Sequence, residues 1–125
     1  MGKKKILIDT SVLIDIQRGT KRTVETFDTL KENAVISRIT ACEFMYGSRN
    51  TEEKDINKDF LEQLPIVEIT PHVSKLAYRL LDKYALKFNV GMADALIAAS
   101  AIYNDLKLWT LNRKHFEKIK EADLF

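Results

Sequence analysis

Residues 91–104, GMADALIAASAIYN, constrain the fold more than any other part of the chain. Their alanine and aliphatic content predicts a helix. The alanines and the serine leave little side-chain bulk, so we expect this helix to lie close against a sheet with its backbone buried. Asp94 falls in its first turn, where a carboxylate complements the helix dipole and can cap free amide groups. Taken alone, Asp94 needs no other explanation than capping.

Short apolar runs alternate with helical patterns through the rest of the chain. Strands are expected over residues 4–8, 34–37, 66–69 and 107–110, with 122–125 as a fifth strand at an edge. Further helices are expected over residues 11–18, 20–32, 40–46, 51–64, 71–88 and 114–119. No hairpin signal separates the strands. The alternation predicts an α/β fold in which helices surround a central, mostly parallel sheet of four or five strands, as one domain over residues 1–125.

Three polar residues near element ends have simple structural explanations. Asp9 closes the first strand in the triplet Asp-Thr-Ser, where Thr10 or Ser11 could cap the following helix. Glu43 fits a capping box with Thr40, in which the glutamate bonds back to the amide of the cap residue. Asn112 suits a turn, because asparagine tolerates unusual backbone angles.

The same residues also form a set that indicates chemistry. Sites in parallel sheets gather beyond the carboxyl ends of the strands, which is where Asp9 and the run from Thr110 to Asn112 lie. Glu43 and Asp94 each lie near the start of a helix. Three carboxylates meeting at one sheet edge would repel each other unless a cation lay between them, and oxygen ligands suit Mg²⁺ or Mn²⁺. We therefore predict Asp9, Glu43 and Asp94 as metal ligands.

Four motifs, in order, resemble the PIN domain family, and within it the VapC-type toxins of prokaryotic toxin–antitoxin pairs. They are ILIDTSVLID around Asp9, SRITACE ending at Glu43, ADALIAA around Asp94, and TLNRKHF from Thr110 to Phe116. The resemblance covers essentially the whole chain. It implies a PIN-like three-layer sandwich and an endoribonuclease dependent on Mg²⁺ or Mn²⁺, often a homodimer, that a VapB-type antitoxin inhibits. It also implies that the three acids form the metal site.

The chain departs from the family pattern at Asn112, which stands where many members carry a fourth acid. An amide can orient water or bind a metal weakly, but it brings no charge, so a site for one metal ion is expected. Thr110 is expected to orient an acid or a water by hydrogen bonding. Asn112 and Thr110 are therefore further candidate catalytic residues, and His115 is expected to pack or bond near the rim of the site.

A basic stripe is predicted on the helix over residues 71–88. Its members are spaced four residues apart: Lys75, Arg79, Lys83 and Lys87. One interpretation is a track for RNA phosphates, which would make binding strongly salt-dependent. The other is a solvated helix face on which Asp82 relieves part of the repulsion between like charges.

Charge and cysteine content restrict the remaining function classes. The net charge is only +2, so basic residues must be clustered to bind a polyanion. Cys42 is the only cysteine, which excludes an intramolecular disulfide and a cysteine-based zinc site. No run is long enough to span a membrane. We expect a soluble protein of the reducing cytoplasm.

Two other functions are compatible with this pattern. A phospho-receiver signalling domain is also a parallel α/β fold with carboxylates around Mg²⁺, but it requires adjacent acids after the first strand, and here Asp9 is followed by Thr10 and Ser11. A catalytically silent RNA- or protein-binding PIN module would explain the missing fourth acid by lost activity.

Overall fold

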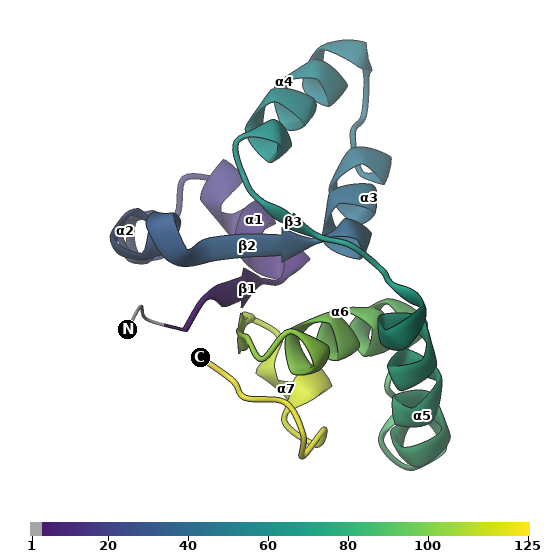
Figure 1. The fold of residues 1–125 in the computed structure, drawn as a ribbon. Helices are drawn as coiled ribbons and strands as arrows, with labels where there is room; N and C mark the ends of the chain where they lie inside the picture. The colour runs from purple at the N-terminus through teal and green to yellow at the C-terminus, as the bar shows by residue number, and fades with distance from the viewer. Residues whose placement is uncertain (1–3) are drawn as a thin grey trace.

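The computed structural model describes residues 4–125. Strands and helices alternate along the chain, and the parallel strands form a sheet that lies between the helices (Figure 1). The strands are β1 (Ile6–Ile8), β2 (Ala34–Ser37), β3 (Ile66–Val67) and β4 (Lys107–Trp109). All neighbours are parallel, in the order β3-β2-β1-β4. The predicted α/β fold with a mostly parallel sheet is confirmed.

The helices form two layers around this sheet. They are α1 (Thr10–Gln17), α2 (Lys21–Leu30), α3 (Arg38–Tyr46), α4 (Thr51–Glu62), α5 (Pro71–Phe88), α6 (Met92–Tyr103) and α7 (Arg113–Phe116), with a 3₁₀ turn, η1 (Lys31–Asn33), after α2. Helices α1 to α4 cover one face of the sheet and α5 to α7 cover the other (Figure 1). The chain is therefore a three-layer sandwich, as the resemblance implied.

Side chains of the central strands alternate between the two layers. In β1, Ile6 and Ile8 belong to the core under α1, α3 and α4, and Leu7 belongs to the core under α5 and α6. In β2, Val35 shares the core of Leu7, while Ile36 shares that of Ile8. Both faces of these strands are buried, which explains why they read as continuous apolar runs rather than as alternating patterns.

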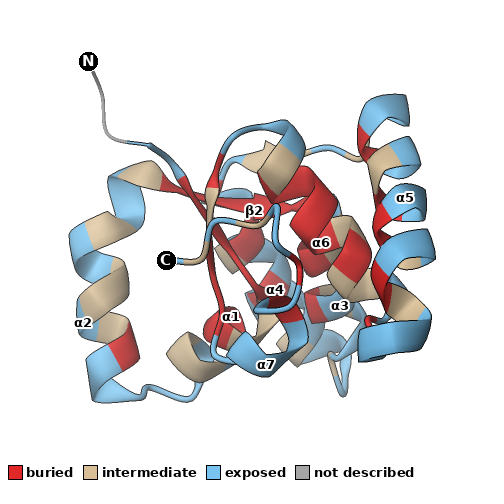
Figure 2. Ribbon diagram, turned by 90° about the horizontal axis from the view of Figure 1, so that it is seen from below, coloured by how far each residue is buried: buried red, intermediate tan, exposed pale blue. Residues whose placement is uncertain are grey.

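Helix α6 lies between the sheet and α5 and is buried over most of its surface (Figure 2). Ala95, Ala98, Ala99 and Ala101 are at most 1% exposed. Their small side chains let the backbone of α6 approach the sheet on one side and α5 on the other. The expected burial of this alanine-rich helix is confirmed, and it fixes the position of Asp94 in the first turn.

The order of the strands creates a crevice at one edge of the sheet. From β1 the chain moves outward to β2 and β3, with the connecting helices on one face, and then returns across β1 to β4 through α5 and α6 on the other face. The direction of winding reverses between β1 and β4, and such switch points leave a crevice beyond the carboxyl ends of the strands. Asp9 and Thr110 directly follow these two strand ends.

The expected fifth strand is not formed. Residues 122–125 pair with the sheet only through an isolated parallel bridge between Leu124 and Leu108, in which the amide of Leu108 donates to the carbonyl of Asp123 and the amide of Phe125 donates to the carbonyl of Leu108. The amide of Ala122 instead donates to the carbonyl of Ile119 in a turn, 3.1 Å away, so it takes no part in a ladder. The sheet therefore has four strands. The helix expected over residues 114–119 is the shorter α7.

Both predicted caps are also wrong. The N-cap of α1 is Asp9, while Thr10 and Ser11 lie inside the helix. Helix α3 begins two residues before Thr40, and its N-cap is Ser37, whose hydroxyl accepts the amide of Thr40 at 3.1 Å. Glu43 is thus too far along α3 to form a capping box.

Within residues 4–125, no helix is long and apolar enough to cross a membrane.

Candidate active site

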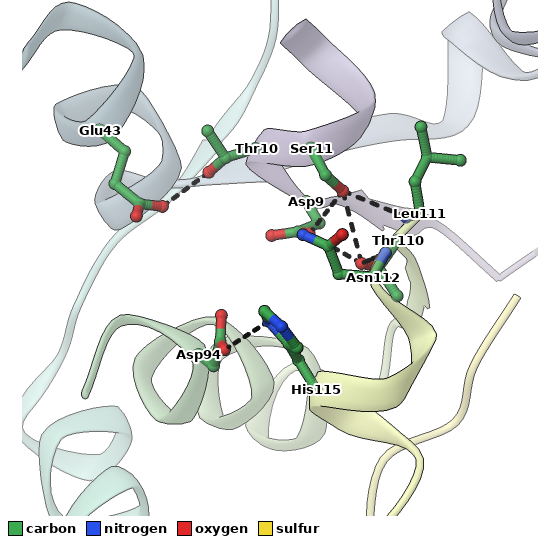
Figure 3. Close-up of polar contacts among 9 residues, drawn as sticks. All are labelled: Asp9, Thr10, Ser11, Glu43, Asp94, Thr110, Leu111, Asn112 and His115. Atoms are coloured by element: carbon green, nitrogen blue, oxygen red, sulfur yellow. Dashed lines mark hydrogen bonds and ion pairs between the residues drawn. The ribbon is translucent and has the colours of Figure 1, made fainter. Parts of the chain in front are cut away.

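An open pocket of about 700 Å³ lies at the switch point between β1 and β4. Four of the predicted site residues line it: Asp9, Glu43, Asp94 and Asn112. They come from the end of β1, from α3, from the first turn of α6 and from the loop after β4 (Figure 3). The fold thus brings together side chains that are far apart in the sequence.

Asp9 is held by hydroxyl groups from the first turn of α1 and from the end of β4. The hydroxyls of Ser11 and Thr110 both donate to Asp9 Oδ2, each at 2.8 Å (Figure 3). Ser11 Oγ in turn accepts the amide of Leu111 at 3.1 Å, and Thr110 Oγ1 accepts the amide of Asn112 at 2.9 Å. This network ties the loop after β4 to the end of β1. Asp9 is only 4% exposed, so its carboxylate is fixed in orientation.

Glu43 is held from α1 rather than from its own helix. The hydroxyl of Thr10 donates to Glu43 Oε1 at 2.7 Å (Figure 3). Thr10 also lies 3.1 Å from the hydroxyl of Thr40, which is fully buried and bonded to Ser37. The buried hydroxyls thereby position Thr10, and Thr10 directs the exposed Glu43 carboxylate at the pocket.

Asp94 is paired with His115 across the pocket. His115 Nδ1 lies 3.1 Å from Asp94 Oδ2 (Figure 3). The pKa of the Asp94 carboxyl is raised above its ordinary value, and burial is the largest cause. The charge and hydrogen bond of His115 lower this pKa, while the negative charges of Asp9 and Glu43 raise it further. The three carboxylates therefore influence one another electrostatically, and a cation between them would relieve the repulsion.

The donor set suits a hydrated hard cation rather than a closed metal cage. Among residues 4–125, no three His, Cys, Asp or Glu side chains lie close enough to surround one ion directly. The hydrogen bonds at this site use one oxygen of each carboxylate, leaving Asp9 Oδ1, Glu43 Oε2 and Asp94 Oδ1 without a partner in that part of the chain. Mg²⁺ commonly keeps several waters and uses one or two carboxylates, so these free oxygens fit such an ion.

Comparison with known proteins decides the family. The model of the PIN domain family matches residues 6–122. The chain belongs to the PIN domain family. It is 39% identical over 126 residues to Ribonuclease VapC1 of Methanocaldococcus jannaschii, a match that covers 98% of this chain and 86% of that protein. The resemblance drawn from the motifs is confirmed, and the phospho-receiver interpretation is wrong.

Solved structures share the PIN fold of this chain. A toxin–antitoxin complex from Klebsiella pneumoniae superposes with a TM-score of 0.81 at 25% identity, covering 94% of this chain and 95% of that one. DNA-bound VapBC from Salmonella typhimurium superposes with a TM-score of 0.84 at 23% identity, covering 98% of each chain. The second likeness concerns the fold alone.

Asn112 and Thr110 differ in how they contribute to this PIN site. Asn112 lines the pocket, and its φ of −102° shows that it does not adopt the left-handed conformation that favours asparagine. Its side chain does not cap α7. Thr110 is 3% exposed and lies behind Asp9, where its hydroxyl makes a hydrogen bond of the kind predicted. The catalytic roles of both residues stay predictions.

The basic stripe lies elsewhere on the PIN domain. Its four members are exposed on α5 and do not line the acidic pocket. Lys75 and Arg79 flank a separate hollow beside Tyr78. Lys83 pairs with Glu121 at 3.1 Å rather than with Asp82. Whether the stripe binds RNA stays a prediction.

The sequence did not indicate a place in this site for four residues that line it: Thr10, Ser11, Asp15 and Arg18. Thr10 and Ser11 were interpreted as helix caps, although the triplet Asp-Thr-Ser at a strand end also places two hydroxyls beside a carboxylate. Arg18, at the end of α1, lines the acidic pocket and carries no local pattern that distinguishes it from any exposed arginine.

Proposed function

We propose that this protein is a VapC-type toxin, an endoribonuclease that depends on Mg²⁺ or Mn²⁺ and hydrolyses RNA phosphodiester bonds. The observation that carries the proposal is the meeting of Asp9, Glu43 and Asp94 at one pocket, in a chain 39% identical to Ribonuclease VapC1. A cluster of carboxylates with free oxygens suits a divalent cation, and such a cation suits a phosphodiester substrate.

Asp9, Glu43 and Asp94 would hold the cation through their free oxygens, in part through water. When bound, a divalent cation neutralises charge on the phosphodiester and acidifies water. Ser11 and Thr110 keep Asp9 in one orientation, and Thr10 does the same for Glu43. Glu43 is the exposed carboxylate of the three, and it accepts a proton from the attacking water. The amide of Asn112 orients that water.

This assignment fixes the products. The water oxygen forms a bond to phosphorus, and the bond from phosphorus to the 3′ oxygen breaks. One proton of the water goes to Glu43, and the 3′ oxygen leaves as an alkoxide that takes a proton from solvent water and becomes a hydroxyl group. The 2′-hydroxyl is not the nucleophile, so the ends are a 5′-phosphate and a 3′-hydroxyl.

The proposal extends to partners and setting. Solved structures of the same fold are toxin–antitoxin complexes, which supports a VapB-type antitoxin as the partner that neutralises this chain. We also infer that residues 1–125 act as one domain, that the protein forms a homodimer and that it works in the cytoplasm. The exposed stripe of Lys75, Arg79, Lys83 and Lys87 would bind RNA away from the cleavage site.

A cleavage assay tests the proposal. Purified protein, free of any co-purifying inhibitor, is incubated with total tRNA and with a generic single-stranded RNA, in Mg²⁺ or Mn²⁺ and in EDTA. We expect discrete cleavage that EDTA and Asp94→Asn both abolish. Asp28→Asn, which removes an exposed acid on α2, serves as the matched control and keeps activity.

Three results would contradict the proposal. Cleavage that survives Asp94→Asn would place the activity elsewhere or in a contaminant. Ends with a 2′,3′-cyclic phosphate would exclude water as the nucleophile. Tight RNA binding with no turnover in either metal would favour a catalytically silent binding module.

A further inference from the structure

A second pocket adjoins the acidic pocket and shares three residues with it. It has a volume of about 730 Å³, and both pockets are lined by Ile14, Arg18 and Glu43. Its other walls come from the end of α1, from α3 and α4, and from the segment that connects these two helices. The two pockets therefore lie side by side, with Arg18 at their shared border.

The charge of the first pocket makes Arg18 unusual. Four carboxylates line that pocket: Asp9, Asp15, Glu43 and Asp94. Arg18 is exposed at its border, and its guanidinium makes no hydrogen bond or ion pair with any residue from 4 to 125. The nearest acid along α1, Asp15, instead accepts the hydroxyls of Thr20 and Thr23 at 2.9 and 2.6 Å. A guanidinium in this state is available to a ligand.

Most of the other polar groups along the second pocket are already engaged; Glu52, which is exposed, is the exception and makes no hydrogen bond or ion pair with any residue from 4 to 125. Arg49 pairs with Glu53 at 3.0 Å, and Asn50 caps α4 by accepting the amide of Glu53. Asn57, only 3% exposed, accepts from Gln17 at 2.6 Å and donates to Ser48 at 2.8 Å. This network around the buried Asn57 connects Gln17, the residue before Arg18, to α4 and so holds the end of α1 in place.

We propose that Arg18 binds an RNA phosphate adjacent to the scissile one, where the strand passes from the acidic pocket into the second pocket. This inference rests on the proposed ribonuclease function. A planar guanidinium can bind a phosphate through two parallel hydrogen bonds, which matches a strand that must be held beside repelling carboxylates. Arg18 contributes to binding equally before and during the reaction, so its loss raises KM and leaves kcat unchanged.

Salt-dependent binding of a fluorescein-labelled oligouridylate tests the inference without turnover. The protein carries Asp94→Asn, and binding is measured in Mg²⁺ over a range of salt concentrations. Adding Arg18→Gln is expected to weaken binding about tenfold, the scale of one exposed charge-assisted contact. The slope of log K against log salt should fall by about 0.7, as for one phosphate contact to a single strand. Arg18→Lys should keep most of that slope.

Arg22→Gln is the matched control, because Arg22 is an exposed arginine on α2 that lines neither pocket. It should change affinity less than about twofold, the scale of a screened surface charge. If Arg18→Gln has no more effect than Arg22→Gln, or if the Asp94→Asn protein does not bind the oligouridylate at all, the inference is overturned. RNA cleavage by the wild type with an unchanged KM in Arg18→Gln would overturn the inference alone and leave the proposed function standing.

Discussion

Replacing Thr110 with valine removes one hydroxyl and nearly keeps the shape of the side chain. The hydroxyl donates to Asp9 Oδ2 at 2.8 Å and accepts the amide of Asn112 at 2.9 Å. Thr110 and Asp9 are 3% and 4% exposed, so water cannot easily replace the bond between them, whereas Asn112 is exposed and water can take over its amide. A hydrogen bond to a charged group contributes about 1.5–3 kcal/mol, and the bond to Asp9 accounts for most of the expected loss.

Ser11 still donates to the same oxygen of Asp9 in the variant, which limits the loss. We therefore expect Thr110→Val to lower the free energy of unfolding by about 2 kcal/mol. For a chain of this length, that corresponds to a decrease in Tm of roughly 7 °C. Because Asp9 is no longer fully oriented, metal affinity or cleavage should also fall at least about tenfold, as for other residues that orient a ligand.

Urea unfolding in EDTA measures the stability, and the RNA cleavage assay measures the activity. Thr110→Ser keeps the hydroxyl and is the control, so it should retain most of both. In the Asp9→Asn background, Thr110→Val should cost less than in the wild type, since the two residues share one hydrogen bond. A Thr110→Val protein within about 0.5 kcal/mol of the wild type, the scale of a neutral substitution, would show that the hydroxyl does not support Asp9.

Three further predictions concern the rest of the molecule. In EDTA, Asp94→Asn should be more stable than the wild type at neutral pH, because the raised pKa of Asp94 means that its charged form destabilises the fold. Thermal unfolding should show this gain in stability disappear below the ordinary aspartate pKa of about 3.9. No gain at pH 7 would contradict a raised pKa of Asp94. Glu121→Gln should lower the free energy of unfolding by less than about 1 kcal/mol at neutral pH, since the hydrogen bond from Tyr84 lowers the pKa of this exposed acid. The loss should disappear as the pH falls and Glu121 becomes protonated. A loss that urea unfolding finds to be the same at every pH would show that it does not come from the charge of Glu121. Ala98→Leu should lower the free energy of unfolding by about 1–3 kcal/mol through overpacking in α6, and an unchanged urea midpoint would show that α6 is not tightly packed.

The layers of the fold follow from short-range patterns in the sequence. The alanines of α6 predicted a helix buried against a sheet, and the apolar runs of β1 and β2 predicted strands covered on both faces. Residues 122–125 are also mostly apolar, yet the amide of Ala122 is used by a turn and the segment makes only an isolated bridge to Leu108 rather than a strand. Composition alone does not distinguish these two outcomes.

The hydrogen bonds of the site depend on contacts that are distant in the sequence. Glu43 and Thr40 have the spacing of a capping box, yet β2 ends early enough for Ser37 to cap α3, and Glu43 bonds to Thr10 instead. Thr10 lies 33 residues away from Glu43, so no local pattern could assign this bond. In the same way, the spacing of the stripe on α5 gave no sign that Lys83 pairs with Glu121.

Binding of Mn²⁺ followed by calorimetry tests most directly whether the three carboxylates act as one cation site. We expect the wild type to bind Mn²⁺ and expect Asp9→Asn and Asp94→Asn each to weaken this binding strongly. The double variant should bind little worse than either single variant, because both residues contribute to one site. Undiminished Mn²⁺ binding in either single variant would contradict the assignment of this pocket as the metal site.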